Sequence, residues 1–295
     1  MGLILLRYGE LALKSRPVRL RFERTLMRNI EQQFLGKAQE CLLSREWGRI
    51  MAHVRDDGEA VQILGRIFGI TSFSPAIECS SEAEEVARLA AERSLGLVRP
   101  GQSFAIRARR VGTHPYTSQQ LASRAGAAVL AANEGRGLRV DLSAPDAELF
   151  IEVRGKRAYL FAERFPGPGG LPMGTQGRVA ALLEDERSAA AAWLMMKRGC
   201  WVVAAGEGGG ADRALAMLRP WAPALALHPL PGPSGSALER LAAFATRRRC
   251  EALVLGSAYA ELEKGIPVAG MPVLFPLCGM SEPAVTAAVM RVRAG

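Results

Sequence analysis

The sequence has few cysteines and no long apolar segment, and each shortage excludes a class of protein. Its five cysteines are odd in number, and no two are spaced as C-x-x-C, so neither a disulfide framework nor a zinc site is indicated. The longest uncharged run, residues 220–238, contains five prolines and cannot form a membrane-spanning helix. Charge begins at Arg7, which is too early for a secretory signal. We therefore expect a cytoplasmic protein without a membrane segment.

The composition is that of a folded globular protein with an excess of positive charge. Hydrophobic residues make up 49% and charged residues 23% of the 295 residues, a length that suggests about two domains. Lysine and arginine number 38 against 29 acidic residues, which gives a net charge of +9. The balance is 25 against 19 up to residue 176 and 13 against 10 after it. This excess favours a polyanionic partner, although a generally basic surface without a ligand is the alternative.

The first 78 residues follow the order of a ferredoxin-like domain. Leu3–Arg7 is a short apolar strand, and Val18–Phe34 has one apolar stripe and an arginine-rich remainder, as an amphipathic helix does. Two strands, a helix and a strand follow, which completes the order β-α-β-β-α-β. These further elements are expected at 41–43, 49–54, 59–68 and 72–77. The pattern predicts a small sheet covered by a helix with a cationic outer face.

The next segment, up to residue 165, begins with a helix expected at 82–95. Phe104 and Ile106 then alternate with polar residues, as in a half-buried strand, and three arginines end that strand. Thr117 is a helix start signal for a helix reaching residue 132. Two alternating strands are expected at 147–153 and 157–163. The segment is therefore a second unit of helices and strands.

A segment rich in proline and glycine, at 166–176, separates the two halves of the chain. Its four glycines and three prolines disfavour a packed element, so we expect a hinge. Beyond it, apolar strands alternate with amphipathic helices, which is the pattern of a doubly wound parallel sheet. The fold class is therefore α/β, with an α+β N-terminal half. Strands are expected at 179–183, 201–205, 224–227, 252–255 and 272–276, and helices at 187–197, 211–218, 237–248 and 283–292.

Five strings in the sequence resemble motifs of one known family. They are RYGELALK at 7–14, RRVGTHPYTS at 109–118, VDL at 140–142, GPGGLPMGT at 167–175 and WLMMKRG at 193–199. In this order they are similar to the tRNA 4-thiouridine synthetase, or tRNA sulfurtransferase, family. The resemblance is close up to residue 178 and loose beyond residue 200. It implies a ferredoxin-like domain at 1–78, a THUMP RNA-binding domain at 79–165, the hinge at 166–176 and a degenerate PP-loop ATPase-like domain at 177–295.

The resemblance implies that the N-terminal half binds the acceptor region of tRNA, and the residue types suit this role. Guanidinium groups beside the backbone N–H groups of a helix N-terminus fit phosphate oxygens. The alternative is that the arginines are a solvated strand face, that Thr117 is only a cap, and that His114, which precedes a proline, is structural. The residues expected to contact RNA are Lys14, Arg16, Arg21, Arg107, Arg109, Arg110, His114, Thr117 and Ser118.

The C-terminal half departs from the family at the loop that would bind ATP. The resemblance implies a Ser-Gly-Gly-x-Asp-Ser turn whose N–H groups hold the phosphates, but the sequence at 184–188 is EDERS, without glycine. Three consecutive carboxylates there would repel a triphosphate. A magnesium ion held by these carboxylates is the alternative. The degenerate nucleotide site comprises Leu182, Leu183, Glu184, Asp185, Glu186, Ser188 and Gly256.

Other parts of the family's machinery are also missing. Basic residues expected before the fourth strand are replaced by PGPSG at 231–235, and only Gly256 remains of the loop after it. The sulfur-relay cysteine has no convincing counterpart, because Cys200, Cys250 and Cys278 adjoin apolar strands and are expected to be buried hydrophobic side chains. We therefore expect no catalytic residue, no metal site and no bound cofactor.

Two functions remain open at this point. The first is a tRNA-binding protein that has lost ATP-dependent sulfur transfer and acts as a binding or accessory subunit. The second is an active tRNA sulfurtransferase that makes 4-thiouridine, with ATP and magnesium as cofactors and with sulfur or missing residues supplied by a partner. A link to thiamine thiazole synthesis is a third interpretation. A homodimer or a catalytic partner chain is compatible with each.

Overall fold

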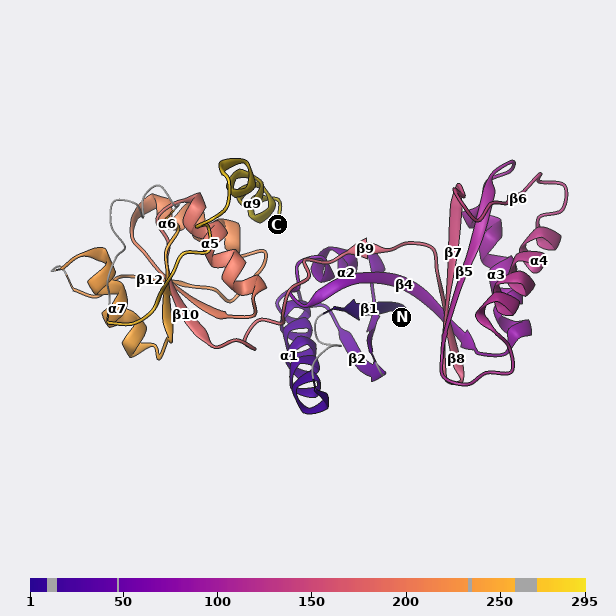
Figure 1. The fold of residues 1–295 in the computed structure, drawn as a ribbon, viewed down its shortest axis with the longest axis horizontal. Coiled ribbons are helices and arrows are strands. Elements are labelled where there is room, and N and C mark those ends of the chain that lie inside the picture. Colours follow the sequence, from indigo (N-terminus) through magenta and orange to yellow (C-terminus); the bar gives the residue numbers. More distant parts are fainter. Residues whose placement is uncertain (10–14, 47, 233–234, 258–269) are drawn as a thin grey trace.

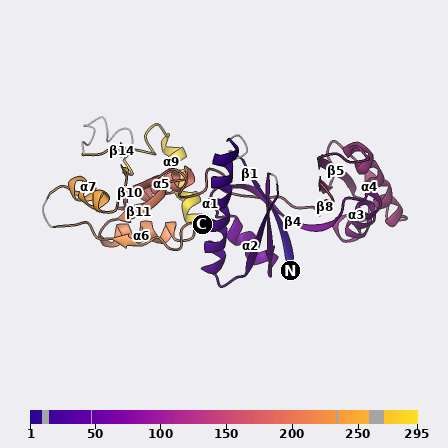
Figure 2. The ribbon, with the colours of Figure 1, turned by 90° about the horizontal axis from the view of Figure 1, so that it is seen from below.

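The structure is a computed structural model that describes residues 1–9, 15–46, 48–232, 235–257 and 270–295. A mixed sheet organises the N-terminal half, and a parallel sheet organises the C-terminal half. Figures 1 and 2 show three parts in a row, with the first helix α1 and the first strands in the middle. None of the helices in these described ranges is long and apolar enough to cross a membrane.

The middle part is an antiparallel sheet with two helices on one face. Along α1, Phe22, Leu26, Ile30 and Phe34 recur every four residues, and all four are buried in the core formed with this sheet. The structure therefore contains the amphipathic helix that the sequence predicts. The elements are β1 (Gly2–Tyr8), α1 (Arg16–Leu35), β2 (Cys41–Glu46), β3 (Arg49–Val54), α2 (Asp57–Leu64) and β4 (Ile70–Ser80).

Strand β4 runs through both parts of the N-terminal half. Its residues up to Ala76 pair with β1, and Ile77–Ser80 pair with β8. The boundary expected at residue 78 therefore falls inside one eleven-residue strand. A single nine-stranded sheet results, in the order β2-β3-β1-β4-β8-β7-β5-β6 with β9 beside β4. The further elements are α3 (Ala83–Leu97), β5 (Ser103–Val111), α4 (Ser118–Ala132), β6 (Arg139–Val140), β7 (Ala147–Arg154), β8 (Arg157–Phe161) and β9 (Phe165–Pro166).

The C-terminal sheet has five parallel strands in the order β12-β11-β10-β13-β14. Helices α5, α6 and α9 share a core on one face, and α7 packs on the other, which is the doubly wound arrangement. Strands β12 and β14 are shorter than expected. A turn in which the N–H of Leu225 donates to the carbonyl oxygen of Ala222 at 2.9 Å precedes β12, and Pro229 follows it, while prolines 272 and 276, which cannot donate to a ladder, flank β14. The elements are β10 (Arg178–Leu182), α5 (Glu186–Lys197), β11 (Trp201–Ala205), α6 (Gly208–Leu218), β12 (Leu227–His228), α7 (Ala237–Arg247), β13 (Ala252–Val254), β14 (Val273–Leu274) and α9 (Glu282–Ala294).

The segment 166–176, which was expected to be a hinge, is hydrogen-bonded to both halves. The N–H group of Gly167 donates to the carbonyl oxygen of Thr71 at 3.0 Å, on the N-terminal side. The N–H group of Leu171 donates to the carbonyl oxygen of Lys197 at 2.9 Å, on the C-terminal side. In this structure the segment is a connector with paired backbone groups. That the two halves can be separated as folded pieces stays a prediction.

One aromatic side chain of the N-terminal half enters the core of the C-terminal half. Phe68 follows α2 and is 3% exposed. Its ring centroid lies 5.6 Å from that of Trp193 on α5 and 5.6 Å from that of Trp221, which follows α6. These rings belong to one continuous core, so the two halves share buried apolar surface.

Replacing Phe68 by alanine should destabilise the protein by about 3–5 kcal/mol, because the change removes a buried ring from this shared core. Urea unfolding followed by tryptophan fluorescence measures the loss. Leu42→Ala, at a β2 position that is 62% exposed, is the control and should change the free energy of unfolding by less than about 0.5 kcal/mol. Equal stabilities of the two variants would show that Phe68 does not hold the halves together.

Candidate functional site

The N-terminal sheet has one face without helices. On this face, side chains of the part with α1 and α2 lie near side chains of the part with α3 and α4. In β1, Leu5 and Arg7 alternate with the residues that pack under α1 and α2. In β7, Ile151 belongs to the core under α3 and α4, which turns Glu152 to the opposite face. Leu5 and Tyr159 of β8 share a small apolar core, so the helix-free faces of the two parts meet there.

Glu152 is a buried carboxylate held between two arginines. Only 4% of the residue is exposed. Arg49 donates from Nη2 to its Oε2 at 3.2 Å and places Nε 3.0 Å from Oε1, while the Nε of Arg154 donates to Oε1 at 2.6 Å. Burial alone would raise the pKa of Glu152, but the two guanidinium groups outweigh burial and hold the pKa below its ordinary value. The carboxylate is therefore ionised at neutral pH.

Arg7 lies beside this pair in a largely buried position. Its Nη1 donates to Ser74 Oγ at 3.0 Å, and its guanidinium carbon lies 4.6 Å from the ring centroid of Phe161. Burial lowers the pKa of Arg7 to about 10, and repulsion from Arg49 adds to this effect while Glu152 opposes it. Among the described residues, its buried Nη2 has no hydrogen-bond partner. A buried donor without a partner costs free energy, so the fold holds this guanidinium group in a position that is not fully satisfied.

Arg164 completes a group that we call the arginine cluster. Its guanidinium carbon lies 4.3 Å from the ring centroid of Phe150, and the side chain is exposed. Four cations around one carboxylate leave an excess of positive charge, and partial burial strengthens its attraction for an anion. The arginine cluster consists of Arg7, Arg49, Arg154, Arg164 and Glu152.

The three arginines predicted at the end of β5 do not act together. Arg109 is exposed and lies beside Glu152 in the β5–β7 register, at the edge of the arginine cluster. Arg107 is on the same face, but its Nε donates to Glu148 at 2.7 Å, which neutralises much of its charge. Alternation along the strand turns Arg110 toward the opposite face. The structure thus places Arg109 at the edge of the arginine cluster and Arg110 away from it.

The predicted residues near the start of α4 are used by the turn itself. Thr117 caps the helix, since its hydroxyl accepts from the N–H of Gln120 at 3.1 Å and the Gln120 side chain accepts from the Thr117 N–H at 2.7 Å. The His114 ring stacks on Tyr116 with centroids 5.7 Å apart. Ser118 is the first residue of α4. These contacts give each residue a structural role, and RNA contact at them stays a prediction.

The two predicted arginines of α1 lie away from the arginine cluster. Arg16 and Arg21 are exposed on α1, which packs on the other face of the sheet and adjoins the C-terminal domain (Figure 2). Lys14 lies outside the described residues. The sequence carries one signal for the cluster, because Glu152 is a charged residue within an apolar stretch of β7 and a buried charge needs partners.

The loop after β10, where the family would bind phosphate, closes on its own side chains. Leu182 and Leu183 are buried at the end of the strand. Asp185 then caps α5 by accepting from the Ser188 N–H at 2.8 Å. The Ser188 hydroxyl accepts from the N–H groups of Glu184 at 2.9 Å and Asp185 at 3.0 Å. Three backbone donors that could face an anion are therefore already occupied.

Close backbone packing leaves little room beside this loop. A Cβ atom added at Gly210 would lie 2.0 Å from the carbonyl oxygen of Glu184. One added at Gly256 would lie 2.7 Å from the backbone nitrogen of Ser188. The glycine that the sequence retains at 256 is thus required by the close approach of the loop after β13 to the start of α5. This approach fills part of the crevice where a doubly wound sheet usually binds its ligand.

The acidic residues of this loop are not all free to repel a phosphate. Glu186 forms an ion pair with Arg293, and the neighbouring Arg187 donates from Nη2 to Glu282 at 3.0 Å, so both ends of α9 are joined to the first turn of α5. Glu184 and Asp185 are exposed. Within the described ranges, no three or more His, Cys, Asp or Glu side chains are grouped so that they could hold a metal ion.

The cysteines differ in one respect from the expectation. Cys200 and Cys250 are buried, and burial raises the pKa of both thiols. Cys278, expected to be buried, is exposed because it lies in the turn after β14, where its N–H donates to the carbonyl oxygen of Phe275 at 3.0 Å. Cys200 and Cys250 thus behave as small hydrophobic side chains.

Comparison with known proteins places the chain in a family. Residues 3–74 match the ThiI ferredoxin-like domain, and residues 81–163 match the THUMP domain. A probable tRNA sulfurtransferase of Methanosarcina acetivorans is 37% identical over 281 residues, which cover 89% of this chain and 68% of the relative. The chain belongs to the tRNA sulfurtransferase family. A relative of the same name from Methanothermobacter thermautotrophicus is 44% identical over 207 residues, and the match covers 51% of its length.

Solved structures of this fold cover nearly the whole chain. PH1313 from Pyrococcus horikoshii Ot3 has a TM-score of 0.84 with 27% sequence identity, and the match covers 99% of both chains. A 4-thiouridine synthetase, solved as a complex with RNA and bound ATP, has a TM-score of 0.78 with 24% identity, and the match covers 85% of that chain. Both confirm the α/β fold class, and the second likeness concerns the fold alone.

Replacing Glu152 by glutamine should destabilise the protein by about 3 kcal/mol at neutral pH, because the buried arginines lose their anion. The pKa of Glu152 in the folded protein lies below its ordinary value of 4.5. Its contribution is therefore present above that pH and lost as the pH falls through the folded pKa, so the difference between wild type and variant should narrow on acidification. Urea unfolding at a series of pH values measures this.

The control is Glu148→Gln, which removes a partly exposed ion pair with Arg107 and should change the free energy of unfolding by less than about 1 kcal/mol. Equal losses in the two variants, or a Glu152→Gln loss that does not depend on pH, would contradict the electrostatic role of Glu152.

Proposed function

We propose that the chain binds tRNA on the helix-free face of its N-terminal sheet, and that its C-terminal domain serves as an accessory part without ATP-dependent sulfur transfer. The observation that carries the first half is the arginine cluster. Arg49 and Arg154 bind the buried carboxylate of Glu152, Arg7 and Arg164 add positive charge beside them, and Arg109 lies at the edge. The excess of basic residues up to residue 176 adds long-range attraction for a polyanion.

The geometry of the arginine cluster favours direct hydrogen bonds to phosphate groups over a loose, long-range attraction of ions. Aromatic rings hold two of the guanidinium groups, since Phe161 lies under Arg7 and Phe150 under Arg164. Planar groups fixed in this way lose less freedom when they bind phosphate oxygens. The relatives are named tRNA sulfurtransferases, and a 4-thiouridine synthetase was solved with RNA, which supports tRNA as the polyanion. Binding of its acceptor region is part of the proposal.

Replacing both Arg109 and Arg164 by glutamine should weaken tRNA binding and flatten its salt dependence. Each phosphate that an arginine no longer neutralises takes roughly 0.9 from the slope of log K against log salt on a duplex, so the slope should fall by about two units at most. Both side chains are exposed, so the fold should tolerate the change. Fluorescence anisotropy with a labelled tRNA transcript, at a series of salt concentrations, measures the slope.

The matched control is Arg88→Gln with Arg93→Gln, which removes the same charge from exposed positions on α3, on the helix face of the sheet. It should leave the slope nearly unchanged. If both double variants flatten the slope equally, binding is a property of net charge and not of the arginine cluster. Absence of tRNA binding by the wild-type chain at low salt would contradict the proposal as a whole.

The second half of the proposal is supported by the loop after β10. A phosphate nest needs free N–H groups, and here the Ser188 hydroxyl and the Asp185 carboxylate take three of them. Freeing them would cost about 1 kcal/mol or more, because the helix would no longer be capped. Glu184 and Asp185, both exposed residues of this loop, also add negative charge where a triphosphate would bind.

A second candidate function is an active sulfurtransferase. It is favoured by one observation, which is that the match to the Methanosarcina acetivorans relative covers 89% of this chain and therefore reaches into the C-terminal domain. In this alternative, the chain uses ATP and magnesium, and a partner chain supplies sulfur and some of the catalytic residues. Direct measurement of ATP binding separates the two candidates.

We expect no heat of binding when Mg·ATP is titrated into the full chain at concentrations up to the millimolar range. The variant Glu184→Ala, Asp185→Ala, Glu186→Ala removes the carboxylates and frees the Ser188 N–H group. The Ser188 hydroxyl still occupies the other two N–H groups, so the variant should not gain ATP binding either. Micromolar binding of Mg·ATP by the wild type that this triple substitution alters would place a nucleotide at the loop and favour the active enzyme.

A further inference from the structure

A cavity of about 580 Å³ lies between α1 and the C-terminal domain. Arg178 and Trp201, the first residues of β10 and β11, line it. It is therefore at the amino ends of these strands, at the opposite end of the sheet from the loop after β10 that the family uses for ATP. Its volume is within the range of pockets that bind small molecules. Neither the arginine cluster nor the Ser188 loop contributes a wall.

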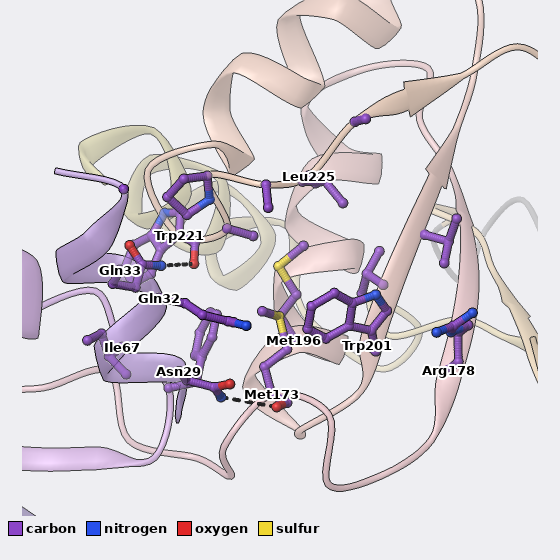
Figure 3. A pocket seen from close by; sticks show the side chains of 18 of the residues that line it. Asn29, Gln32, Gln33, Ile67, Met173, Arg178, Met196, Trp201, Trp221 and Leu225 are labelled. Atoms are coloured by element: carbon purple, nitrogen blue, oxygen red, sulfur yellow. Dashed lines mark hydrogen bonds between the residues drawn. The ribbon is translucent and has the colours of Figure 1, made fainter. Parts of the chain in front are cut away.

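The apolar walls of the cavity include indole rings and thioethers as well as aliphatic side chains. Met173, Met196, Trp201 and Trp221 contribute, and Trp201 is 37% exposed. Figure 3 shows Trp201, Met196 and Gln32 directed to the same space between α1 and the sheet. An indole beside flexible thioethers provides a flat, adaptable surface that suits a planar ring.

Two amides on α1 are fixed at the wall that this helix contributes. The Nδ2 group of Asn29 donates to the carbonyl oxygen of Met173 at 3.0 Å, and the Nε2 group of Gln33 donates to that of Trp221 at 3.0 Å (Figure 3). These bonds orient both amides and leave their carbonyl oxygens as acceptors. They also join α1 to the C-terminal domain, so a molecule in the cavity would touch both halves of the chain.

The charged groups that line the cavity are cationic. Arg178 and Arg248 line it, and both are exposed. Arg178 donates from Nη1 to the carbonyl oxygen of Arg248 at 3.1 Å, and Arg248 Nη2 lies 3.1 Å from His228 Nδ1. No Asp or Glu is among the described residues that line the cavity. A ligand with an anionic group is therefore favoured over a neutral or cationic one.

We propose that this cavity binds a small molecule with a planar apolar body and one anionic group. The ring lies against Trp201 and Met173, which are both partly exposed, and the anion is directed to Arg178. Because the walls come from α1 and from the C-terminal sheet, such a ligand binds the docked arrangement of the two halves and stabilises it. The proposal does not depend on tRNA binding, because the arginine cluster is on the other face of the N-terminal sheet from α1.

Two fluorescent probes with the same ring system test the proposal on the full chain. 8-Anilinonaphthalene-1-sulfonate carries an anion, and N-phenyl-1-naphthylamine is neutral. We expect saturable binding of both to the wild type, with the sulfonate bound more tightly. Arg178→Gln should weaken the binding of the sulfonate probe by up to about fivefold, which is the size of the contribution of an exposed ion pair. The affinity for the neutral probe should change by less than about twofold. Trp201→Ala should weaken both by about tenfold.

A filling substitution and two controls complete the design. Leu225→Trp fills the cavity without removing a wall, so it should abolish the binding of both probes. This result would stand even if Trp201→Ala disturbed the fold. Arg213→Gln, an exposed charge on α6, and Met290→Ala, an apolar side chain 58% exposed on α9, should change neither probe. The lining and control variants should all keep wild-type affinity for tRNA in the anisotropy assay. A failure of the tRNA proposal would therefore appear in that assay and would not change the binding of the probes.

Three results would overturn the proposal. The first is that one or both of the probes show no saturable binding to the wild type. Another is binding that Leu225→Trp leaves intact, because the probes would then bind elsewhere. The third is equal weakening of both probes by Arg178→Gln, because Arg178 would then be a wall and not the partner of an anion.

Discussion

The packing of Phe68 against Trp193 and Trp221 is the contact on which the arrangement of the chain depends. The connector at 166–176 has paired backbone groups, but those bonds alone would allow the C-terminal sheet to swing about them. A ring that is 3% exposed and shared by both halves resists such motion, since opening the contact exposes apolar surface. Trp221 also donates from Nε1 to the carbonyl oxygen of Val292 at 3.1 Å, so the same contact positions α9. The cavity beside α1 depends on this contact together with the amide bonds that Asn29 and Gln33 donate to the C-terminal half.

Much of the fold follows from local patterns in the sequence, and the site does not. The four-residue spacing of Phe22, Leu26, Ile30 and Phe34 specifies α1 without knowledge of the rest, and Thr117 specifies the start of α4. The prolines beside β12 and β14 could have predicted their shortness. The residues of the arginine cluster come from strands far apart in sequence, and only the pairing of β4 with both β1 and β8 brings them to one face. A single sequence does not reveal that register.

The candidate nucleotide loop shows how a fold can persist without its ligand. In a phosphate-binding loop, the N–H groups at the start of the helix have no internal acceptor and donate to a bound anion. Here Asp185 and Ser188 satisfy those groups internally, at distances between 2.8 and 3.0 Å. A helix capped in this way gains about 1 kcal/mol of stability that does not depend on nucleotide concentration. The absence of glycine in this loop was visible in the sequence, whereas the reciprocal bonds of Ser188 required the structure.

The arginine cluster has the opposite character, because it is electrostatically incomplete. Arg7 is largely buried with a pKa lowered to about 10, so the fold holds this cation where burial and neighbouring cations disfavour it. One carboxylate, Glu152, compensates for several guanidinium groups and is buried beneath them. An anion that reaches the helix-free face would relieve repulsion among groups that are already oriented, so its binding requires little rearrangement. A merely solvated basic strand would spread its charges to avoid that repulsion. The concentration of arginines around one carboxylate is therefore better explained by a phosphate-bearing partner than by solubility.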